Sequence, residues 1–244
     1  MLLGFAGIGV VVALHWLTFY GAIKLANASV AVTCIALAPV FLALVEPLIT
    51  DKRFDARELA LGIAVVPGVA LVVGGVAPDM RLGVAVGTLS ALLVAIFGSL
   101  NKRYVLRGDP LAVTGLEMAA GVLVLSLLAP WLVQTWPGLT LPWQWPAGDD
   151  LWLLLLLALG CTLLPFALSL VALRQLSAFS AQLAINLEPV YAILLAMLLL
   201  GEQTELSLSF YLGVAVLLLG VFIHPLLTRR AIAGPGDEPT RTAD

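Results

Sequence analysis

The sequence predicts an all-α integral membrane protein with about eight transmembrane helices, and two observations predict it. Of the 244 residues, 61% are hydrophobic and only 11% are charged, whereas a soluble domain carries about 25% charged residues. The charged residues also gather in short polar breaks between long apolar runs. A soluble fold of this length has too little interior for so much apolar surface, while a bilayer allows the outside of a protein to be apolar as well.

The apolar runs have the length of membrane helices. Each run is close to the roughly 20 residues that a helix needs to cross about 30 Å of hydrocarbon. Barrel strands would be shorter and would alternate apolar and polar residues, which these runs do not. The first run has no basic region before it and is longer than a signal-peptide core, so it is interpreted as a span. The eight spans are expected at residues 2–23, 28–49, 59–76, 82–100, 111–133, 151–173, 178–200 and 206–227.

Basic residues predict the orientation. With eight spans, ten of the 12 Lys and Arg residues fall on one side, and only Lys24 and Arg81 fall on the other. Because cytoplasmic loops carry the excess of basic residues, both termini are expected in the cytoplasm, with the protein in a bacterial inner (plasma) membrane. The longest outer connection carries several tryptophans that indicate an aromatic belt at the headgroups, with a substrate lid as the alternative: Trp136, Trp143 and Trp145, flanked by Trp131 and Trp152.

Composition and motifs narrow the function classes. The net charge of −3 suggests no nucleic-acid partner, and Cys34 and Cys161 lack the spacing of a disulfide framework or zinc site. The sequence contains no GxxxxGK[ST] phosphate loop, no HExxH and no GxSxG. We therefore expect no catalytic residues, no metal, no cofactor and no enzymatic activity. The expected partners are the lipid bilayer and a small-molecule solute, and a homodimer stays open.

An internal repeat is visible when residues 24–49 are placed over residues 174–199. Pro39 then falls on Pro189, and Lys24 falls on Arg174. An odd number of spans separates the copies, so they are expected to be upside down relative to each other. The domains are therefore a partial first repeat of three helices (1–76), a second repeat of five helices (82–227) and a disordered cytoplasmic tail (228–244). Inverted repeats are frequent in secondary transporters, which place the substrate site near mid-membrane between the copies.

Two stretches carry a family resemblance. HWLTFYGAIKLANASVAVTCIALAPVFLALVEPLI and LAINLEPVYAILLAMLLLGEQTELSLSFYLGVAVLLLGV resemble parts of the two repeats of EamA-like permeases in the drug/metabolite transporter superfamily. The most specific residues are Leu187-Glu188-Pro189-Val190, Gly201-Glu202, Gly213 and Gly220. The family plan has ten helices in two five-helix inverted repeats, so this chain is expected to be an incomplete ten-helix bundle that lacks the first two helices. In the first copy Ala38-Pro39 replaces the acidic–proline pair.

The resemblance implies a function. It implies a permease that moves a small organic metabolite, such as an amino acid or a related compound, by alternating access. A non-transporting membrane scaffold or a truncated remnant of a transporter is the alternative, which the missing helix pair favours. A membrane-embedded enzyme is less favoured, because it would need a nucleophile–base or metal cluster.

The seventh span carries two candidate substrate-binding residues, Glu188 and Asn186. An ionisable group at the centre of a membrane helix costs about 2.5–3.5 kcal/mol, so Glu188 is interpreted as a ligand for a substrate amine or a proton, with a hydrogen-bonded packing role as the alternative. Gln182 and Asn186 share one helical face, while Glu188 lies on another. Both faces can meet one cavity only if the helix is locally unwound.

The first span carries three more candidates, His15, Trp16 and Tyr20. Trp16 and Tyr20 are four residues apart and share a face that His15 borders. They are expected to form an aromatic cage for a cation or a ring, with packing as the alternative. Phe166 occupies the repeat-equivalent place of Trp16 and completes the predicted substrate-binding set.

Other intramembrane residues receive structural interpretations. Glu117 is expected to bond between helices, and Glu46 to reach the membrane interface. Thr33 and Ser90 are expected to bond the backbone of their own helices. Four prolines are expected to interrupt spans and two glycines to allow close helix packing: Pro39, Pro67, Pro165 and Pro189, with Gly83 and Gly87.

Overall fold

Helices form every regular element of the part of the chain that the structure describes. The computed structural model describes residues 2–135, 148–185, 188–200, 208–209 and 211–216. Its long and short α-helices are α1 (Leu2–Leu25), α2 (Ala28–Ile35), α3 (Ala38–Ile49), α4 (Ala56–Ile63), α5 (Val66–Gly74), α6 (Arg81–Tyr104), α7 (Pro110–Thr135), α8 (Asp150–Leu155), α9 (Leu164–Leu173), α10 (Ala178–Ile185) and α11 (Glu188–Leu195). The 3₁₀ turns η1 (Pro78–Met80) and η2 (Val105–Arg107) flank α6, and the π-helical segments η3 (Leu156–Leu163) and η4 (Ala196–Leu200) precede α9 and follow α11.

Five described stretches are long and apolar enough to cross a membrane. They are Leu2–Leu25, Ala28–Ile49, Pro78–Arg107, Pro110–Thr135 and Asp150–Leu173. Together with the all-helical structure they confirm the predicted membrane fold. The helices α4 and α5 lie where the third span is expected. Parts of the seventh and eighth spans, Trp136, Trp143 and Trp145, and the 228–244 tail lie outside the described residues.

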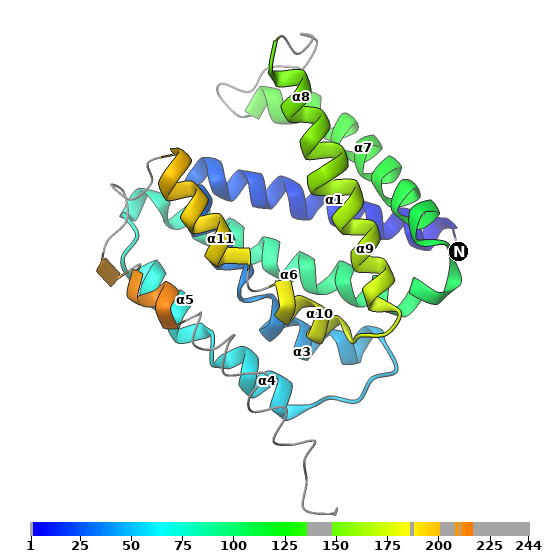
Figure 1. Ribbon diagram of the computed structural model, residues 1–244, viewed down its shortest axis with the longest axis horizontal. Helices are drawn as coiled ribbons and strands as arrows, with labels where there is room; N and C mark the ends of the chain where they lie inside the picture. Colours follow the sequence, from blue (N-terminus) through cyan, green and yellow to red (C-terminus); the bar gives the residue numbers. More distant parts are fainter. Residues whose placement is uncertain (1, 136–147, 186–187, 201–207, 210, 217–244) are drawn as a thin grey trace, which may run out of the picture.

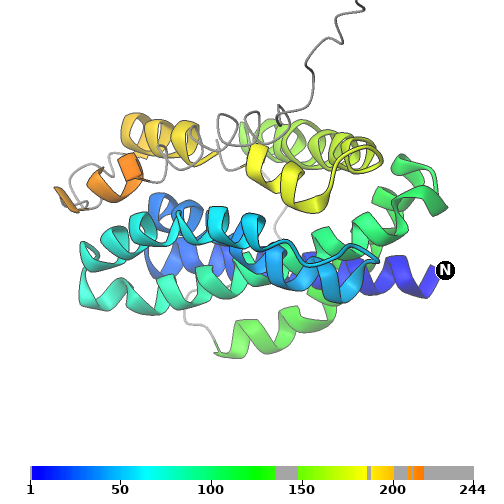
Figure 2. The ribbon, with the colours of Figure 1, turned by 90° about the horizontal axis from the view of Figure 1, so that it is seen from below.

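The helices pack in two layers. Figure 2 shows α9, α10 and α11 in one layer above the layer that contains α1 to α6. In Figure 1, α1 and α6 run side by side through the middle of the bundle, and α4 and α5 follow its lower edge. The main buried cluster joins both layers, since it contains Phe5 and Ile8 of α1, Leu170 of α9 and Phe179 of α10. This packing places the inner faces of α1 and α6 opposite α9 and α10.

Three of the four prolines expected to interrupt spans follow a break between two helices, and the fourth, Pro165, follows a π-helical segment within one continuous span. Each is the second residue of the helix that follows the interruption: Pro39 in α3, Pro67 in α5, Pro165 in α9 and Pro189 in α11. Proline has no N–H to donate, so the carbonyl four residues earlier loses its helical partner. The helices α2, α4 and α10 end at those carbonyl residues, which are Ile35, Ile63 and Ile185. Before Pro165 the chain instead forms the π-helical segment η3.

The two proline breaks of the proposed repeats correspond in position. The helix α2 has eight residues and ends at Ile35, and α10 has eight residues and ends at Ile185. The next helices begin at Ala38 and Glu188. The same offset of 150 residues relates both pairs, as it relates Pro39 to Pro189. This agreement supports the internal repeat seen in the sequence.

Glycines allow the close approach of α6 to α2 and to the α1–α2 connection, and of α1 to α7. A Cβ atom at Gly83 would lie 2.7 Å from Ala26 Cβ, and one at Gly87 would lie 2.9 Å from Cys34 Cβ. The expected close packing at Gly83 and Gly87 is therefore confirmed. The tightest contact is at Gly9 of α1, where a Cβ would collide with the backbone carbonyl oxygen of Glu117 in α7.

We expect Gly9→Ala to destabilise the protein. The clash is with helix backbone, which cannot rotate away, so the two helices must separate at a cost of about 1–3 kcal/mol. Gly7→Ala is the matched control on the same helix, because a Cβ there meets nothing within 4 Å. Thermal unfolding of the purified protein in detergent measures both. An equal melting temperature for the two variants would contradict the close packing of α1 on α7.

Candidate substrate cavity

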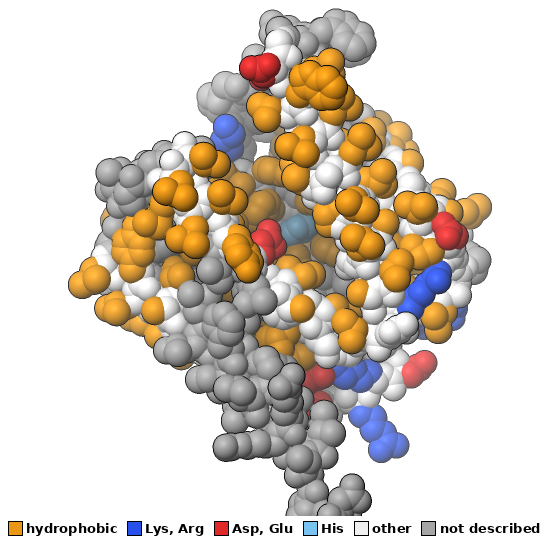
Figure 3. Space-filling model, viewed as in Figure 1, with side chains coloured by type: hydrophobic (Ala, Val, Ile, Leu, Met, Phe, Trp, Pro, Cys, Tyr) orange, Lys and Arg blue, Asp and Glu red, His pale blue; other side chains and the backbone are white. Residues whose placement is uncertain are grey.

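A cavity of about 1010 Å³ lies between the two helical layers. Figure 3 shows the corresponding face hollowed between apolar side chains. Its walls include five of the six candidate residues predicted from the sequence: His15, Trp16, Tyr20, Phe166 and Glu188. The sixth candidate, Asn186, lies outside the described residues. The structure therefore brings residues of α1, α9 and α11 to one space, and substrate binding by them stays a prediction.

His15 is held in place by Ser90 of α6. Its Nδ1 lies 2.8 Å from Ser90 Oγ and 3.2 Å from the Ser90 carbonyl oxygen, while Ser90 Oγ lies 3.1 Å from the His15 carbonyl oxygen. Both carbonyls can only accept, so the network assigns the proton to Nδ1 and directs the hydroxyl proton to the His15 carbonyl. This tautomer leaves Nε2 as a hydrogen-bond acceptor. The expectation that Ser90 bonds its own helix is wrong, because its hydroxyl bonds His15 of the neighbouring helix α1 instead.

Aromatic rings from three helices form a continuous row along the cavity. The ring of His15 lies 6.0 Å from Phe19 and 5.5 Å from Phe97, and Phe97 lies 6.2 Å from Phe166. Such separations are typical of favourable ring contacts. Sequence reasoning missed Phe97, although it stands seven residues after Ser90 and therefore on the same face of α6. The row gives an organic solute an aromatic wall.

Polar groups face the cavity from α10, α11 and α6. Gln182 is buried and its Nε2 has no partner among the described residues, and Asn101 is buried with an unpartnered Oδ1. Glu188 is exposed to the cavity. Gln182 and Glu188 both line the cavity, although one continuous helix would place them on different faces. They meet there because α10 ends at Ile185 and α11 begins at Glu188.

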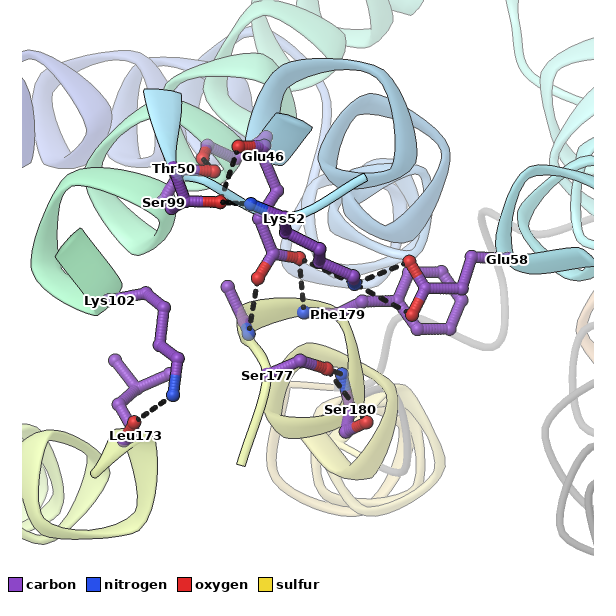
Figure 4. Close-up of polar contacts among 12 residues, drawn as sticks. Glu46, Thr50, Lys52, Glu58, Ser99, Lys102, Leu173, Ser177, Phe179 and Ser180 are labelled. Atoms are coloured by element: carbon purple, nitrogen blue, oxygen red, sulfur yellow. Dashed lines mark hydrogen bonds and ion pairs between the residues drawn. The ribbon is translucent and has the colours of Figure 1, made fainter. Parts of the chain in front are cut away.

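Glu46 lies at one end of the cavity, where it bonds the backbone of the lining residue Ala178. We call this end the basic end, because Lys52, Lys102 and Arg103 lie there. Glu46 is only 1% exposed, and Figure 4 shows its carboxylate reaching from α3 to the start of α10. Its Oε1 accepts from the Ala178 N–H at 3.1 Å and its Oε2 from the Phe179 N–H at 3.2 Å. The expectation that Glu46 reaches the membrane interface is therefore wrong.

The start of α10 explains why a carboxylate is needed there. The first four N–H groups of a helix have no partner within it. The Ala181 N–H makes the first helical bond, to the Ser177 carbonyl, and the Ser180 N–H donates to the Ser177 side chain. Glu46 supplies acceptors for two of the earlier N–H groups, those of Ala178 and Phe179. The negative charge also lies at the positive end of the helix dipole, which stabilises it.

Lys52 pairs with Glu46 and Glu58 in one layer and lies over the Phe179 ring of α10 in the other. Its Nζ lies 3.2 Å from Glu46 Oε2 and 2.6 Å from Glu58 Oε2. Burial lowers the pKa of Lys52, but the hydrogen bond to Glu58 and the charge of Glu46 outweigh burial and raise the pKa above its ordinary value. Burial raises the pKa of Glu58, with the hydrogen bond from Lys52 acting against it. We call Glu46, Lys52, Glu58 and the first turn of α10 the latch.

The raised pKa of Lys52 sets the pH range in which the latch keeps its positive charge. A lysine whose pKa is raised on folding contributes stability below its ordinary pKa, and loses that contribution as pH rises through the higher folded value. The cation therefore persists throughout the neutral range. Two further basic residues bond helix ends there, as Lys102 donates to the Leu173 carbonyl and Arg103 to the Ile49 carbonyl. Positive charges at helix C-termini are stabilising.

The arrangement defines a class of protein. In the residues that the structure describes, no group of three or more His, Cys, Asp or Glu side chains could hold a metal ion. The architecture is instead a membrane-spanning helical bundle built around a cavity with aromatic and polar walls, which is the architecture of a membrane transporter.

The family of the chain follows from comparison with known proteins. A model of the EamA-like transporter family matches residues 81–224. The chain belongs to this family and is an integral membrane transporter of the drug/metabolite transporter superfamily. Seven solved chains match the fold. One, described only as the crystal structure of a protein, is 20% identical with a TM-score of 0.64, and the match covers 94% of this chain and 77% of that one. No curated protein matches significantly.

Proposed function

We propose that the chain moves a small organic metabolite, an amino acid or a related compound, through the cavity by alternating access. The observation that carries the proposal is the convergence of His15, Trp16, Tyr20, Phe166 and Glu188 on one space between the layers. These residues come from both proposed repeats, residues 1–76 and 82–227. A cavity shared by two repeats is the usual substrate site of inverted-repeat transporters.

The cavity chemistry favours a solute with an apolar body and an amino group. The aromatic row of Phe19, His15, Phe97 and Phe166 supplies an apolar wall. Among the described lining residues, Glu188 is the only Asp, Glu, Lys or Arg. A carboxylate in this position pairs with a substrate ammonium group. Gln182 and the Nε2 atom of His15 add neutral hydrogen-bonding groups for the rest of the solute.

Alternating access requires ends that open in turn. The latch holds the basic end together, so this end is closed in the described conformation. We propose that the basic end faces the cytoplasm, because ten of the 12 Lys and Arg residues are expected on that side. The breaks that precede Pro39 and Pro189 separate short helices at equivalent positions, and they are candidate hinges.

Counterflow into liposomes tests the proposal. Vesicles that contain the purified full chain and are loaded with an unlabelled mixture of amino acids should take up labelled amino acids from outside. We expect Glu188→Gln to lower uptake of the transported amino acid markedly, because the amide cannot pair with its ammonium group. Asp51→Asn is the control, since it neutralises an exposed carboxylate outside the cavity lining.

Two outcomes would count against parts of this proposal. Uptake by Glu188→Gln equal to that of the wild type would remove Glu188 from the substrate site. Uptake of no amino acid by the wild type, with organic amines equally inactive, would favour the non-transporting scaffold instead.

A further inference from the structure

Asn101 of α6 and Glu117 of α7 form a buried polar pair beside the cavity. Glu117 is fully buried at 0% exposure, and Asn101 is 3% exposed. The Nδ2 of Asn101 donates to Oε2 of Glu117 at 3.4 Å. The two other oxygens of the pair, Glu117 Oε1 and Asn101 Oδ1, are both buried and both lack a hydrogen-bond partner among the described residues. Two neighbouring acceptors without a donor are a costly arrangement in a protein interior.

No described positive charge neutralises Glu117. Glu117 is the only titratable residue of α7, and several charged or titratable groups on the elements packed around it bond elsewhere. His15 of α1 bonds to Ser90, while Lys102 and Arg103 of α6 donate to the carbonyls of Leu173 and Ile49. The remaining titratable side chains of the elements around α7 are Tyr20 and Lys24 of α1, Arg81 and Tyr104 of α6, and Arg107 of η2, which lies over the Tyr104 ring. The helix α9 has none.

One proton between Glu117 Oε1 and Asn101 Oδ1 gives both oxygens a hydrogen-bond partner. We propose that Glu117 and Asn101 form a proton-binding site, in which Glu117 carries a proton that it donates to Asn101 Oδ1 while Asn101 Nδ2 donates back to the carboxyl group. A neutral acid and an amide then exchange two hydrogen bonds, and no charge is buried. The opposite orientation of the amide would place its oxygen against Oε2 of Glu117. That arrangement also sets two acceptors together and needs the same proton.

The proton can be exchanged through the cavity. Asn101 belongs to the cavity lining, whereas Glu117 does not. On release, the O–H bond of Glu117 breaks and the proton passes to cavity water beside Asn101, whose amide N–H continues to bond the carboxylate. Glu117 is also next to the contact with Gly9 of α1. Since α1 carries His15 and Trp16, a shift of α1 that opens or closes the cavity changes the surroundings of Glu117.

The proton bound at this site is the coupling ion of transport, and this assignment rests on the proposed function. A carboxyl group that is neutral in one cavity state and releases its proton in another couples solute movement to a proton gradient. Glu188 binds the solute in this scheme and Glu117 binds the proton. The two carboxyl groups therefore have separable roles.

Infrared spectroscopy of the purified full chain tests the proton site without any transport measurement. At neutral pH the wild type should show a carboxylic acid C=O band that is missing in Glu117→Gln. This variant should fold, because an amide can exchange two hydrogen bonds with Asn101. In Asn101→Leu the band should shift, since the acid loses its partner. Identical spectra of wild type and Glu117→Gln in the acid region would show an ionised Glu117 and overturn the proposal.

Liposome transport separates coupling from transport itself. With labelled amino acids as the probe, an imposed proton gradient should drive accumulation by the wild type. Glu117→Gln should retain counterflow at equal pH and lose this accumulation, because a fixed neutral group leaves solute binding by Glu188 intact but carries no proton. Gradient-driven accumulation by Glu117→Gln would overturn coupling through Glu117. Absence of counterflow in the wild type would contradict the proposed function, while the infrared result would still decide the proton site.

Discussion

Glu46→Ala is expected to open the basic end of the cavity and to destabilise the closed conformation strongly. The substitution removes the carboxylate oxygens that accept from the buried N–H groups of Ala178 and Phe179. Each unsatisfied buried group costs about 1–3 kcal/mol. The substitution also removes one of the two carboxylates that neutralise Lys52. Glu46 is the latch side chain that hydrogen-bonds the backbone of α10, so this change should have the largest effect on the conformation.

Two measurements check this expectation. Thermal unfolding in detergent should show a lower melting temperature for Glu46→Ala than for the wild type. Cys161 lines the cavity and is exposed, so it reports access from the basic end. In membrane vesicles, a charged maleimide added at the cytoplasmic face should label Cys161 faster in Glu46→Ala.

Glu58→Gln is the matched control. Glu58 contacts Lys52, but none of its described bonds goes to α10. Its side chain is 19% exposed, whereas that of Glu46 is 1% exposed. An ion pair that keeps contact with solvent contributes only about 0–1 kcal/mol. We therefore expect little change in melting temperature and none in Cys161 labelling. If Glu46→Ala behaved like Glu58→Gln in both measurements, the latch would not close the basic end.

Local features of the fold were predictable because their causes lie within one helix. Apolar run length is a property of consecutive residues, and the expected spans at 2–23 and 28–49 agree closely with α1 and the α2–α3 pair. The missing N–H of proline acts four residues away, so the break before Pro39 could be placed from the sequence. Thr33 likewise bonds the Ser29 carbonyl of its own helix, as expected.

Contacts between helices were much harder to predict, because they depend on how each helix is rotated in the bundle. Ser90 carries the same hydroxyl group as Thr33, yet it bonds His15, which is 75 residues distant. Glu46 bonds Ala178 across 132 residues. From hydropathy alone, a carboxylate near a helix end is interpreted as an interfacial group. The residues next to Glu46 in the sequence do not show that the start of α10 packs against it. The internal repeat did relate positions far apart in the sequence. It paired Trp16 with Phe166, and both residues line the cavity.

A bulky side chain inside the cavity is expected to have the largest effect on transport. Ala184 of α10 lines the cavity and is exposed to it, so the indole of Ala184→Trp extends into open space and does not displace a packed neighbour. The fold should be retained, with an unchanged melting temperature. Counterflow of labelled amino acids should fall to the level of protein-free liposomes, because every solute that uses the cavity must pass the added ring.

Leu154→Trp separates a blocked path from a general effect of tryptophan. Leu154 of α8 is 50% exposed and does not belong to the cavity lining, so an indole there adds apolar surface towards lipid and should leave counterflow unchanged. Glu188→Gln removes one contact with the solute, whereas Ala184→Trp removes the space itself, and the loss should therefore be greater for every solute. Wild-type counterflow in Ala184→Trp would mean that solutes cross elsewhere, and neither Glu188 nor the aromatic row would then bind them during transport.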